Sequence, residues 1–381
     1  MRERFPAEPD VGLLTGTGFV DFHRRQGSRA AQKEGVSLYA QIQEQLRSSP
    51  RRWLVTGAAG FIGSHIVEEL LQLNQTVRGL DNFVTGNARN LNEVRERVAG
   101  GQWARFTIKT ADIAEAGVAE NAMEGVDIVI HQAGFVSVPL SLERPLACHA
   151  TNVTGTLQVF LSARASSVKR VIYASSSAVY GDDARAEKIE SVLGAPLSFY
   201  GLSKLMDELY AQQCHAHFGL ETIGLRYFNV FGPRQDPTGG YAAVIPQWIS
   251  RMLAGEPCRI HGDGGSTRDF CHVRNVVQAN LLAALTENPM AFGKAYNVAS
   301  GTTRDLNALH GILSTELQKS GLSSTKATPE YGPPRSGDIR HSSADTNTIQ
   351  HDLGFIPEVT FEQGLADTVA WYAATRVAAG A

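Results

Sequence analysis

The 381-residue sequence predicts an α/β fold, in which a doubly wound parallel sheet is joined by a smaller α/β lobe interleaved at its C-terminal side. Two observations lead to this fold class. From residue 51 to residue 230, short apolar runs alternate with helical stretches, as in a parallel sheet covered by helices on both faces. Beyond residue 230 the alternation ends, and Gly/Pro-rich loops of the kind that carry function take its place.

The elements follow in order along the chain. Residues 1–36 show no periodicity and are predicted to be a disordered extension, either an upstream start or a mobile tail. Leu38, Ile42 and Leu46 then have the spacing of a short amphipathic helix. Strands are predicted at 51–57, 76–81, 126–134, 168–175 and 221–230, and helices at 61–73, 150–165 and 200–217.

The run at 294–301 is expected to return to the first sheet as one more strand. We therefore predict a first domain over residues 37–230, rejoined by residues 272–300. A second lobe is predicted over residues 231–271 and 301–381, so that the two parts are interleaved in the sequence.

The composition argues against several classes of partner. A net charge of −3 leaves no basic footprint for nucleic acid or an anionic membrane. No apolar run approaches the roughly 20 residues that span a bilayer, and the N-terminus lacks an apolar signal core. Four cysteines (Cys148, Cys214, Cys258, Cys271) lie far apart without a C-x-x-C pair, so neither a metal site nor a disulfide framework is indicated. A soluble cytoplasmic protein is expected.

The stretch VTGAAGFIGSH carries Gly57, Gly60 and Gly63 directly after a predicted strand and at the start of a helix. Glycines in this order let the backbone approach a pyrophosphate at the helix N-terminus. Asp81 ends the second strand, where a carboxylate accepts hydrogen bonds from a ribose diol and repels a 2′-phosphate. The following Asn82 and Phe83 offer no base, so NAD is favoured over NADP. The alternative is a tight turn with a helix-capping acid.

Two weaker signals accompany this cradle. Asp112 and Ile113 follow a third apolar run and would suit the edge of an adenine. Tyr200 and Lys204, in FYGLSK, stand four residues apart at the start of a predicted helix and so share one face. A phenol in water has a pKa of about 10. A phenol that acts as a base near neutral pH therefore needs a positive charge beside it to lower this pKa. Alone, this pair would indicate only a surface helix.

Together with these motifs, the serine cluster YASSSAVYG, residues 173–181, resembles the short-chain dehydrogenase/reductase superfamily. The order and spacing are similar to its extended branch, which acts on nucleotide-diphospho-sugars, over residues 37–375. The resemblance implies a Rossmann fold, a tightly bound NAD regenerated in each cycle, and a homodimer joined by a four-helix bundle. The further cofactor-binding residues that it implies are Phe61, Ile62, Gly86, Gln132, Ala133 and Tyr227.

The same resemblance assigns roles to the catalytic set. Ser176 would donate a hydrogen bond to the reacting oxygen, and Tyr200 would move its proton. Lys204 would bind the nicotinamide ribose and tune Tyr200. Ser177 is expected to contact the sugar, and Ser175 to end the strand.

The residues after Ser176 narrow the reaction. In dehydratase and decarboxylase relatives an acid commonly follows this serine, whereas here Ser177 and Ala178 stand in its place. The remaining groups suffice to oxidise a sugar carbinol and to reduce the ketone again from its other face, which is 4-epimerisation. A net oxidoreductase, dehydratase or decarboxylase and a non-catalytic NAD-binding regulator are the competing classes.

Later motifs resemble those of UDP-sugar enzymes. Arginines in FGPRQDP, RDF and PRSGD and an aspartate in the last of these would hold the diphosphate and the uridine ribose. The substrate-binding residues implied in this way are Ser137, Asn229, Arg234, Tyr241, Val244, Arg268, Arg335 and Asp338.

Ser342 matches the position that gates the C2 substituent of the sugar in UDP-hexose 4-epimerases, and its small side chain leaves room for an N-acetyl group. The sequence resembles in particular bacterial UDP-N-acetylglucosamine 4-epimerases of O-antigen synthesis. It departs from them at Val136 and Leu140, which could reshape the sugar pocket. UDP-glucose and UDP-galactose, and the uronic acids UDP-glucuronate and UDP-N-acetylglucosaminuronate, therefore stay open as substrates.

Overall fold

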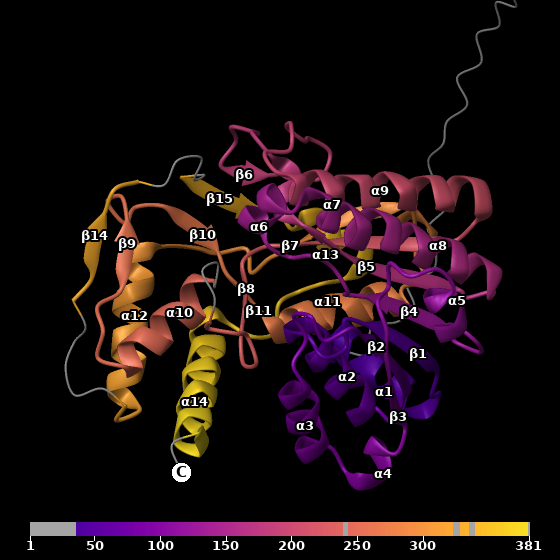
Figure 1. The fold of residues 1–381 in the computed structure, drawn as a ribbon, viewed down its shortest axis with the longest axis horizontal. Coiled ribbons are helices and arrows are strands. Elements are labelled where there is room, and N and C mark those ends of the chain that lie inside the picture. The colour runs from indigo at the N-terminus through magenta and orange to yellow at the C-terminus, as the bar shows by residue number, and fades with distance from the viewer. Residues whose placement is uncertain (1–35, 239–242, 323–327, 335–339, 380–381) are drawn as a thin grey trace, which may run out of the picture. The chain divides into compact units, whose positions relative to one another are not determined.

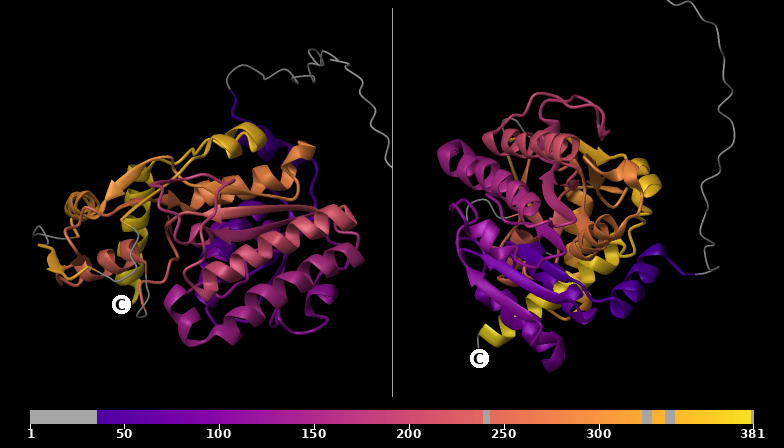
Figure 2. Two further views of the ribbon diagram at one scale, coloured as in Figure 1. Left: turned by 90° about the horizontal axis from the view of Figure 1, so that it is seen from above. Right: turned by 90° about the vertical axis from the view of Figure 1, so that its right-hand side faces the viewer.

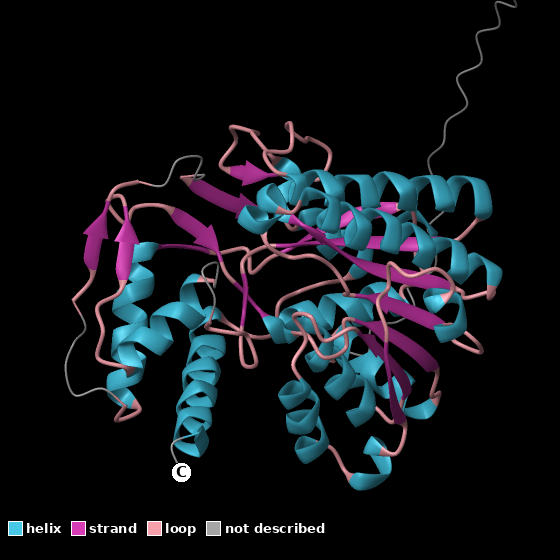
Figure 3. Ribbon diagram, viewed as in Figure 1, coloured by secondary structure: helices cyan, strands magenta, loops and turns pink. Residues whose placement is uncertain are grey.

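The computed structural model describes residues 36–379 apart from 239–242, 323–327 and 335–339. The predicted extension over residues 1–36 therefore lies almost wholly outside the described residues. From Ser37 onward the chain forms one compact unit. Its arrangement of helices and strands is shown in Figures 1 and 3.

The central sheet has seven parallel strands in the order β12-β7-β5-β4-β1-β2-β3 (Figure 1). Its strands are β1 (Arg52–Thr56), β2 (Thr76–Asp81), β3 (Phe106–Thr110), β4 (Ile128–His131), β5 (Arg170–Ser176), β7 (Glu221–Tyr227) and β12 (Lys294–Val298). The predicted doubly wound, or Rossmann, fold is confirmed, and β12 pairs in parallel with β7 as the return strand. The strand order reverses beside β1, which pairs with both β2 and β4, and ligands of such sheets bind at the carboxyl ends there.

Helices cover both faces of this sheet, as the two views of Figure 2 show. Side chains alternate along β1, so that Trp53 and Val55 join one core and Leu54 the other. The first core lies under α1 (Leu38–Ser48), α2 (Phe61–Gln72), α11 (Val273–Leu285) and α13 (Asn347–Leu353). The second lies under α5 (Val118–Ala122), α8 (Gly155–Ala165) and α9 (Phe199–Phe218).

Helix α1 confirms the amphipathic helix predicted after residue 37, with one change of register. Its buried stripe is Tyr39, Ile42 and Leu46, whereas Leu38 is exposed. Tyr39 and Leu46 lie seven residues apart and Ile42 lies between them, which is the spacing of one helix face. The stripe therefore begins one residue later than predicted.

The helix predicted at 150–165 is longer and irregular. It consists of α7 (Pro145–Cys148), a π-helical segment (His149–Thr154) and α8. The π-helical turn carries Asn152, whose amide bonds both the N–H and the carbonyl of Phe135. Such turns are frequent at functional sites, and this one fixes the backbone after β4.

Helices α10 (Val244–Leu253), α12 (Leu306–Lys319) and α14 (Phe361–Ala379) share a third core, within the ranges that the sequence predicts as the second lobe. Its sheet has the order β13-β10-β15-β6, with β13 (Thr303–Asp305), β10 (Thr267–Asp269), β15 (His341–Ala344) and β6 (Glu187–Lys188). Two pairs complete it, β9 (Arg259–His261) with β14 (Glu330–Gly332) and β8 (Val230–Phe231) with β11 (Cys271–His272). Strand β6 comes from the residues predicted to belong to the first domain.

The remaining helices of the first domain are α3 (Ala88–Arg97), α4 (Gly100–Trp103) and α6 (Val138–Glu143). All four cysteines are buried and free. Within the part of the chain that the structure describes, no helix is long and apolar enough to cross a membrane.

Candidate active site

A cavity of about 1540 Å³ lies at the carboxyl ends of the central strands. Its walls come from the glycine-rich turn after β1, the ends of β4 and β5, the start of α9, and the loop after β8 together with α10 and α14. Most of the residues predicted to bind a cofactor or substrate line it. Of these the cavity is lined by Gly57, Gly60, Phe61, Ile62, Gly63, Asp81, Asn82, Gly86, Ile113, Gln132, Ala133, Ser137, Ser176, Ser177, Tyr200, Lys204, Tyr227, Asn229 and Arg234.

The glycines of the turn are required by close backbone contacts. Gly57 has φ +67°, and a Cβ there would lie 2.7 Å from the backbone nitrogen of Ala133. A Cβ on Gly63 would collide with the carbonyl oxygen of Gly57. Helix α2 thus begins directly on the turn, and Gly60 at its N-cap leaves the first N–H groups open to an anion. This cradle fits the pyrophosphate of a dinucleotide.

Asp81 lies at the carboxyl end of β2 with its carboxylate fixed by backbone donors. Oδ2 accepts from the N–H of Ala59 at 2.9 Å, and Oδ1 from that of Phe83 at 2.8 Å. Gly86 makes room for it, since a Cβ there would lie 2.5 Å from Oδ1. The predicted ribose carboxylate is therefore held in one orientation, at the edge of the cavity.

The residues predicted to contact the edge of an adenine form a small hydrogen-bonded group with Asn82. Asn82 donates through Nδ2 to Asp112 Oδ2 at 2.8 Å, and the other oxygen of Asp112 accepts from the N–H of Ala114. Ile113 is buried beside it and lines the cavity. Phe83, with φ +57°, and Asp112 are not among the residues that line the cavity.

Polar residues below the cradle connect three strands. The hydroxyl of Tyr227, at the end of β7, accepts from Gln132 Nε2 at 3.0 Å and from Asn280 Nδ2 at 2.9 Å. Burial raises the pKa of this phenol well above its usual range, so it stays neutral. His131 lies between the hydroxyls of Thr56 and Thr156, at 2.6 and 3.1 Å, and burial lowers its pKa to about 3.

The three serines at and just after the end of β5 all line the cavity but differ in their hydrogen-bond partners. Ser175 is buried and donates to Glu208 at 2.5 Å. That carboxylate is also bonded by the guanidinium of Arg226, at 2.8 and 2.7 Å. Ser176 and Ser177 face the cavity, and Ser176 Oγ accepts from the N–H of Ala178. Strand β5 ends at Ser176, one residue beyond the prediction.

Tyr200 and Lys204 lie one turn apart at the start of α9 and both line the cavity. The N–H of Tyr200 donates to Ser141 Oγ at 3.1 Å, which fixes α9 to α6. Gly201 allows a close approach to the turn after β5, because a Cβ there would lie 2.6 Å from the carbonyl oxygen of Ala178. The phenol and the ammonium are thus placed on the same wall of the cavity as the two serines.

The acids of the cavity are few. Among the described residues that line it, the carboxylates are Asp81 and Asp236. Asp81 is bonded by backbone N–H groups, and Asp236 accepts from the N–H and hydroxyl of Thr238. Neither belongs to the segment that carries Ser176, where Ser177 and Ala178 follow.

Only some of the substrate-binding residues predicted beyond residue 228 line the main cavity. Asn229, with φ +32°, lines the cavity and donates to the carbonyl oxygen of Asp269. Arg268 on β10 and Ser342 on β15 are directly paired in register, so they lie side by side, outside the residues that line the main cavity. Val244 begins α10 and packs against the third core. The predicted Tyr241, Arg335 and Asp338 lie outside the described residues.

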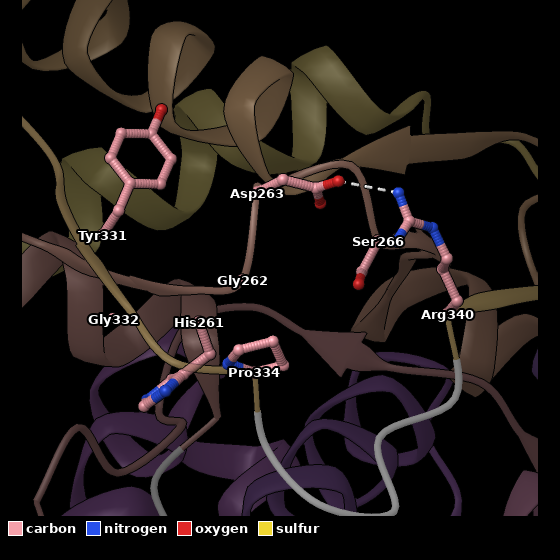
Figure 4. Close-up of a pocket in the computed structure, with 8 residues that line it drawn as sticks. All are labelled: His261, Gly262, Asp263, Ser266, Tyr331, Gly332, Pro334 and Arg340. Atoms are coloured by element: carbon pink, nitrogen blue, oxygen red, sulfur yellow. Dashed lines mark hydrogen bonds and ion pairs between the residues drawn. The ribbon is translucent and has the colours of Figure 1, made fainter.

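A second cavity of about 700 Å³ lies between β9, β14 and the loop before β10 (Figure 4). Its walls include His261, Tyr331 and the ion pair of Asp263 with Arg340 at 2.7 Å. Arg268 reaches its edge, since its Nη1 donates weakly to the carbonyl oxygen of Arg340 at 3.4 Å.

Several polar residues around the site were missed by sequence reasoning. These residues form hydrogen bonds or ion pairs with residues that line the cavity or with one another. They are Thr56, Glu68, Glu93, His131, Thr156, Asp207, Glu208, Arg226 and Asn280. The partners of most of them lie far away in the chain, and no local motif marks them. Arg226 lies inside the strand predicted at 221–230, and the sequence around it does not mark its contact with Glu208.

Comparisons with known proteins agree with this geometry. Residues 53–299 match the model of the NAD dependent epimerase/dehydratase family. The UDP-glucose 4-epimerase of Mycolicibacterium smegmatis is 33% identical over 323 residues, which cover 84% of this chain and 98% of that protein. The structure is similar to that of a UDP-N-acetylglucosamine 4-epimerase from Methanobrevibacter ruminantium solved with UDP-N-acetylmuramic acid.

The similarity to the Methanobrevibacter ruminantium structure has a TM-score of 0.78 at 36% identity, and it covers 86% of this chain and 99% of that chain. A UDP-glucose 4-epimerase of Thermotoga maritima, solved with UDP-glucose, gives a TM-score of 0.76 at 33% identity, with 85% and 99% covered. The glycine cradle, the fixed Asp81 and the Tyr200–Lys204 pair therefore stand where the matched family model covers the chain. The chain belongs to the NAD dependent epimerase/dehydratase family.

Proposed function

We propose that this protein is a UDP-hexose 4-epimerase that interconverts UDP-N-acetylglucosamine and UDP-N-acetylgalactosamine, with UDP-glucose and UDP-galactose as further substrates. The observation that carries the proposal is the composition of the catalytic wall. Ser176, Tyr200 and Lys204 line the cavity, and the two residues that follow Ser176 are Ser177 and Ala178, neither of which is an acid. Elimination of water requires a group that protonates a leaving hydroxyl, whereas epimerisation does not.

NAD, when bound in the cradle, supplies reversible acceptance of the hydride from C4 of the sugar. The chain's residues manage the proton and the oxygen. Tyr200, as the phenolate, takes the proton of the 4-hydroxyl and later returns it to the same oxygen. Ser176 donates a hydrogen bond to that oxygen in both halves of the reaction, and Lys204, one helical turn from Tyr200, binds the nicotinamide ribose.

The return of hydrogen to the opposite face requires the 4-keto sugar to turn over inside the site. A cavity of about 1540 Å³ gives it room to do so while the diphosphate stays bound. For the diphosphate we propose Asn229, Arg268 and Arg335, with Asp338 at the uridine ribose and Tyr241 and Val244 beside the uracil.

The small Ser342 supports the acetamido sugars as substrates. It lies directly beside Arg268 on the neighbouring strand, so the C2 substituent of a sugar anchored by that arginine would approach a hydroxymethyl group rather than a ring. A dimer is part of the proposal. Exposed apolar side chains on α8 and α9 support it (Leu161, Leu202, Leu209, Tyr210 and Phe218). Cys214, also on α9, is buried in the second core and does not belong to this exposed surface.

The test is to incubate the purified protein, without added cofactor, with UDP-N-acetylglucosamine, UDP-glucose and UDP-glucuronate in separate samples. The anomeric proton signals are then followed by NMR. We expect the galacto-configured product from the first two, fastest for the acetamido sugar. Conversion of the glucuronate alone would move the substrate to uronic acids. No product from any of them, with or without added NAD, would overturn the proposed function.

A further inference from the structure

An arginine of the second lobe is buried against two helices of the first domain. Arg234 belongs to the loop after β8, has φ +65°, and its side chain is 0% exposed. Its Nη2 forms an ion pair with Glu68 of α2, and its Nε lies 3.5 Å from Glu93 Oε2 of α3. The sequence assigned this residue to the substrate, but its guanidinium is directed at two carboxylates of the chain.

The same carboxylates bind other elements. Glu93 Oε2 also accepts from the indole N–H of Trp371 on α14 at 2.8 Å, and Oε1 accepts from Arg89 Nε at 3.2 Å. The Arg89 guanidinium lies 5.8 Å from the ring centroid of Trp371. The cluster of Arg234, Glu68, Glu93 and Trp371 therefore joins the loop after β8 and α14 to α2 and α3, and we call it the lobe clamp.

The loop after β8 has a further contact with α14. The hydroxyl of Tyr372, next to Trp371 on α14, donates to the carbonyl oxygen of Gln235. The side-chain amide of Gln235 donates through Nε2 to the carbonyl oxygen of Val230. Asn229, Gln235 and Asp236 of this segment line the main cavity. The lobe clamp thus sets where one wall of the cavity stands relative to the cradle at the start of α2.

Buried ion pairs of this kind are poor sources of net stability, because the charges lose their hydration, yet removing one partner leaves an uncompensated charge. They are best explained by what they fix in space. In a reaction that passes hydrogen between two bound molecules, a misplacement of about 1 Å costs on the order of 100-fold in rate. The lobe that carries the substrate and the domain that carries the cradle are the two parts whose placement matters.

We propose that Arg234 is a positioning residue, which holds the second lobe against the first domain so that the oxidised sugar is reduced again before it can leave. This inference rests on the proposed function. When the lobe clamp is loosened, the 4-keto sugar escapes in a fraction of turnovers. Each escape removes two hydrogen atoms from the sugar: the hydride stays on the enzyme-bound nicotinamide, and the proton goes to solvent through Tyr200.

The variants Arg234→Lys and Glu93→Gln test this. A lysine keeps the charge but cannot reach two carboxylates with a planar fork, and Glu93→Gln keeps the shape. We expect kcat to fall about 10-fold to 100-fold with KM changed less than about 3-fold. Keto sugar should appear in solution, trapped with hydroxylamine, with an equal amount of reduced nicotinamide on the protein. A raised KM at unchanged kcat, with no keto sugar, would make Arg234 a substrate ligand and overturn the proposal.

A matched control is Arg274→Ala. Arg274 of α11 pairs with Asp367 of α14 at 3.5 Å, so this pair also connects the first domain to α14, but both side chains are exposed. It should leave kcat unchanged and release no keto sugar, because exposed pairs contribute little. Leakage equal to that of Arg234→Lys would reduce the effect to general loosening of α14 and refute a specific role for the lobe clamp.

A readout without substrate separates this inference from the proposed function. Hydrogen exchange of the intact protein should speed up in Arg234→Lys in the peptides that cover residues 229–238 and the part of α14 around Trp371 and Tyr372. It should not speed up in α12, which packs in the third core. If the wild type turns over no UDP-sugar, the proposed function fails while this readout still reports on the clamp. Unchanged exchange in those peptides would overturn the clamp itself.

Discussion

Lys204 and Asp207 form a buried ion pair on α9, with the lysine Nζ 3.2 Å from Oδ2 of the aspartate. The ammonium lines the active-site cavity, and the carboxylate lies below it, fully buried. Burial raises the pKa of Asp207 to about 6, although the charge of Lys204 opposes this shift. The cation proposed to act in catalysis is thus held in place by an acid whose pKa burial brings close to neutrality.

The stability of the protein should depend on pH through Asp207. Between the ordinary carboxyl pKa of 3.8 and the native value of about 6, the native state holds a proton that the unfolded chain has lost. This stabilisation is therefore present at low pH and is lost as the pH rises through 6. Asp207→Asn cannot titrate. The difference in free energy of unfolding, wild type minus Asp207→Asn, should fall by about 2 kcal/mol from pH 4 to pH 7 in urea titrations. A difference that is flat with pH would contradict it.

Tyr200→Phe should abolish turnover while leaving the fold and the bound cofactor intact. The variant loses only the hydroxyl that moves the proton, which is expected to cost about 1000-fold in kcat. Tyr210→Phe on the same helix, where the ring is exposed, is the matched control and should behave as wild type. Wild-type turnover by Tyr200→Phe in the NMR assay would remove this residue from the mechanism.

Gly86→Ala should weaken NAD binding without touching the catalytic set. An added Cβ would lie 2.5 Å from Asp81 Oδ1, so the carboxylate must leave the position that its backbone donors give it. We expect an affinity loss of about 10-fold, seen as less NAD retained on purification and as weaker rebinding in calorimetry. Gly100→Ala, where a Cβ meets nothing within 4 Å, provides the control. Equal NAD retention in both variants would show that the Asp81 position does not matter.

Ser342→Tyr should spare UDP-glucose and block the acetamido sugars. The hydroxymethyl group beside Arg268 would be replaced by a ring in the space proposed for the C2 substituent. The expected change is a fall of more than about 100-fold in kcat/KM for UDP-N-acetylglucosamine alone. Ser342→Ala should keep both activities. Equal losses for both substrates in the tyrosine variant would refute the gate.

Leu140→Arg should shift the preference toward uronic acids. Leu140 and Val136 line the cavity near Ser137, and Val136 is 66% exposed, so this edge of the site offers apolar surface and no charge from these two positions. A guanidinium there would attract a C6 carboxylate. We expect the ratio of kcat/KM for UDP-glucuronate to that for UDP-N-acetylglucosamine to rise about 10-fold. An unchanged ratio would place the sugar away from this edge; Leu140→Met serves as the uncharged control.

The parts of the molecule that follow local rules could be predicted from the sequence. Strands buried on both faces read as apolar runs, and the glycine cradle is marked by its own spacing, so the sheet and the first binding motif were recognised. The alternation of side chains along β5 also predicts that Ser175 and Ser176 have different partners, since successive residues of a strand point to opposite faces of the sheet. Ser175 donates to Glu208, whereas Ser176 Oγ accepts from the N–H of Ala178, and both residues line the cavity.

The parts that depend on distant partners could not be predicted. Arg234 and Glu68 are separated by 166 residues, and nothing near either one in the sequence signals the other. The burial of this arginine follows from how α14 and α3 approach the loop after β8, which is a property of the tertiary packing. The same holds for Asp207, which looks like an ordinary helix acid until α8 covers it.

The small strand β6 has a consequence for protein engineering. Its two residues leave the first domain and add an edge to the sheet of the second lobe, where Ser343 and Ala344 pair with Glu187 and Lys188. A graft that transplanted residues 231–271 and 301–381 onto another scaffold would expose the open edge of β15, a site for wrong pairing and aggregation. Chimeras that exchange sugar specificity between such enzymes should therefore carry the segment around residues 181–198 with the lobe.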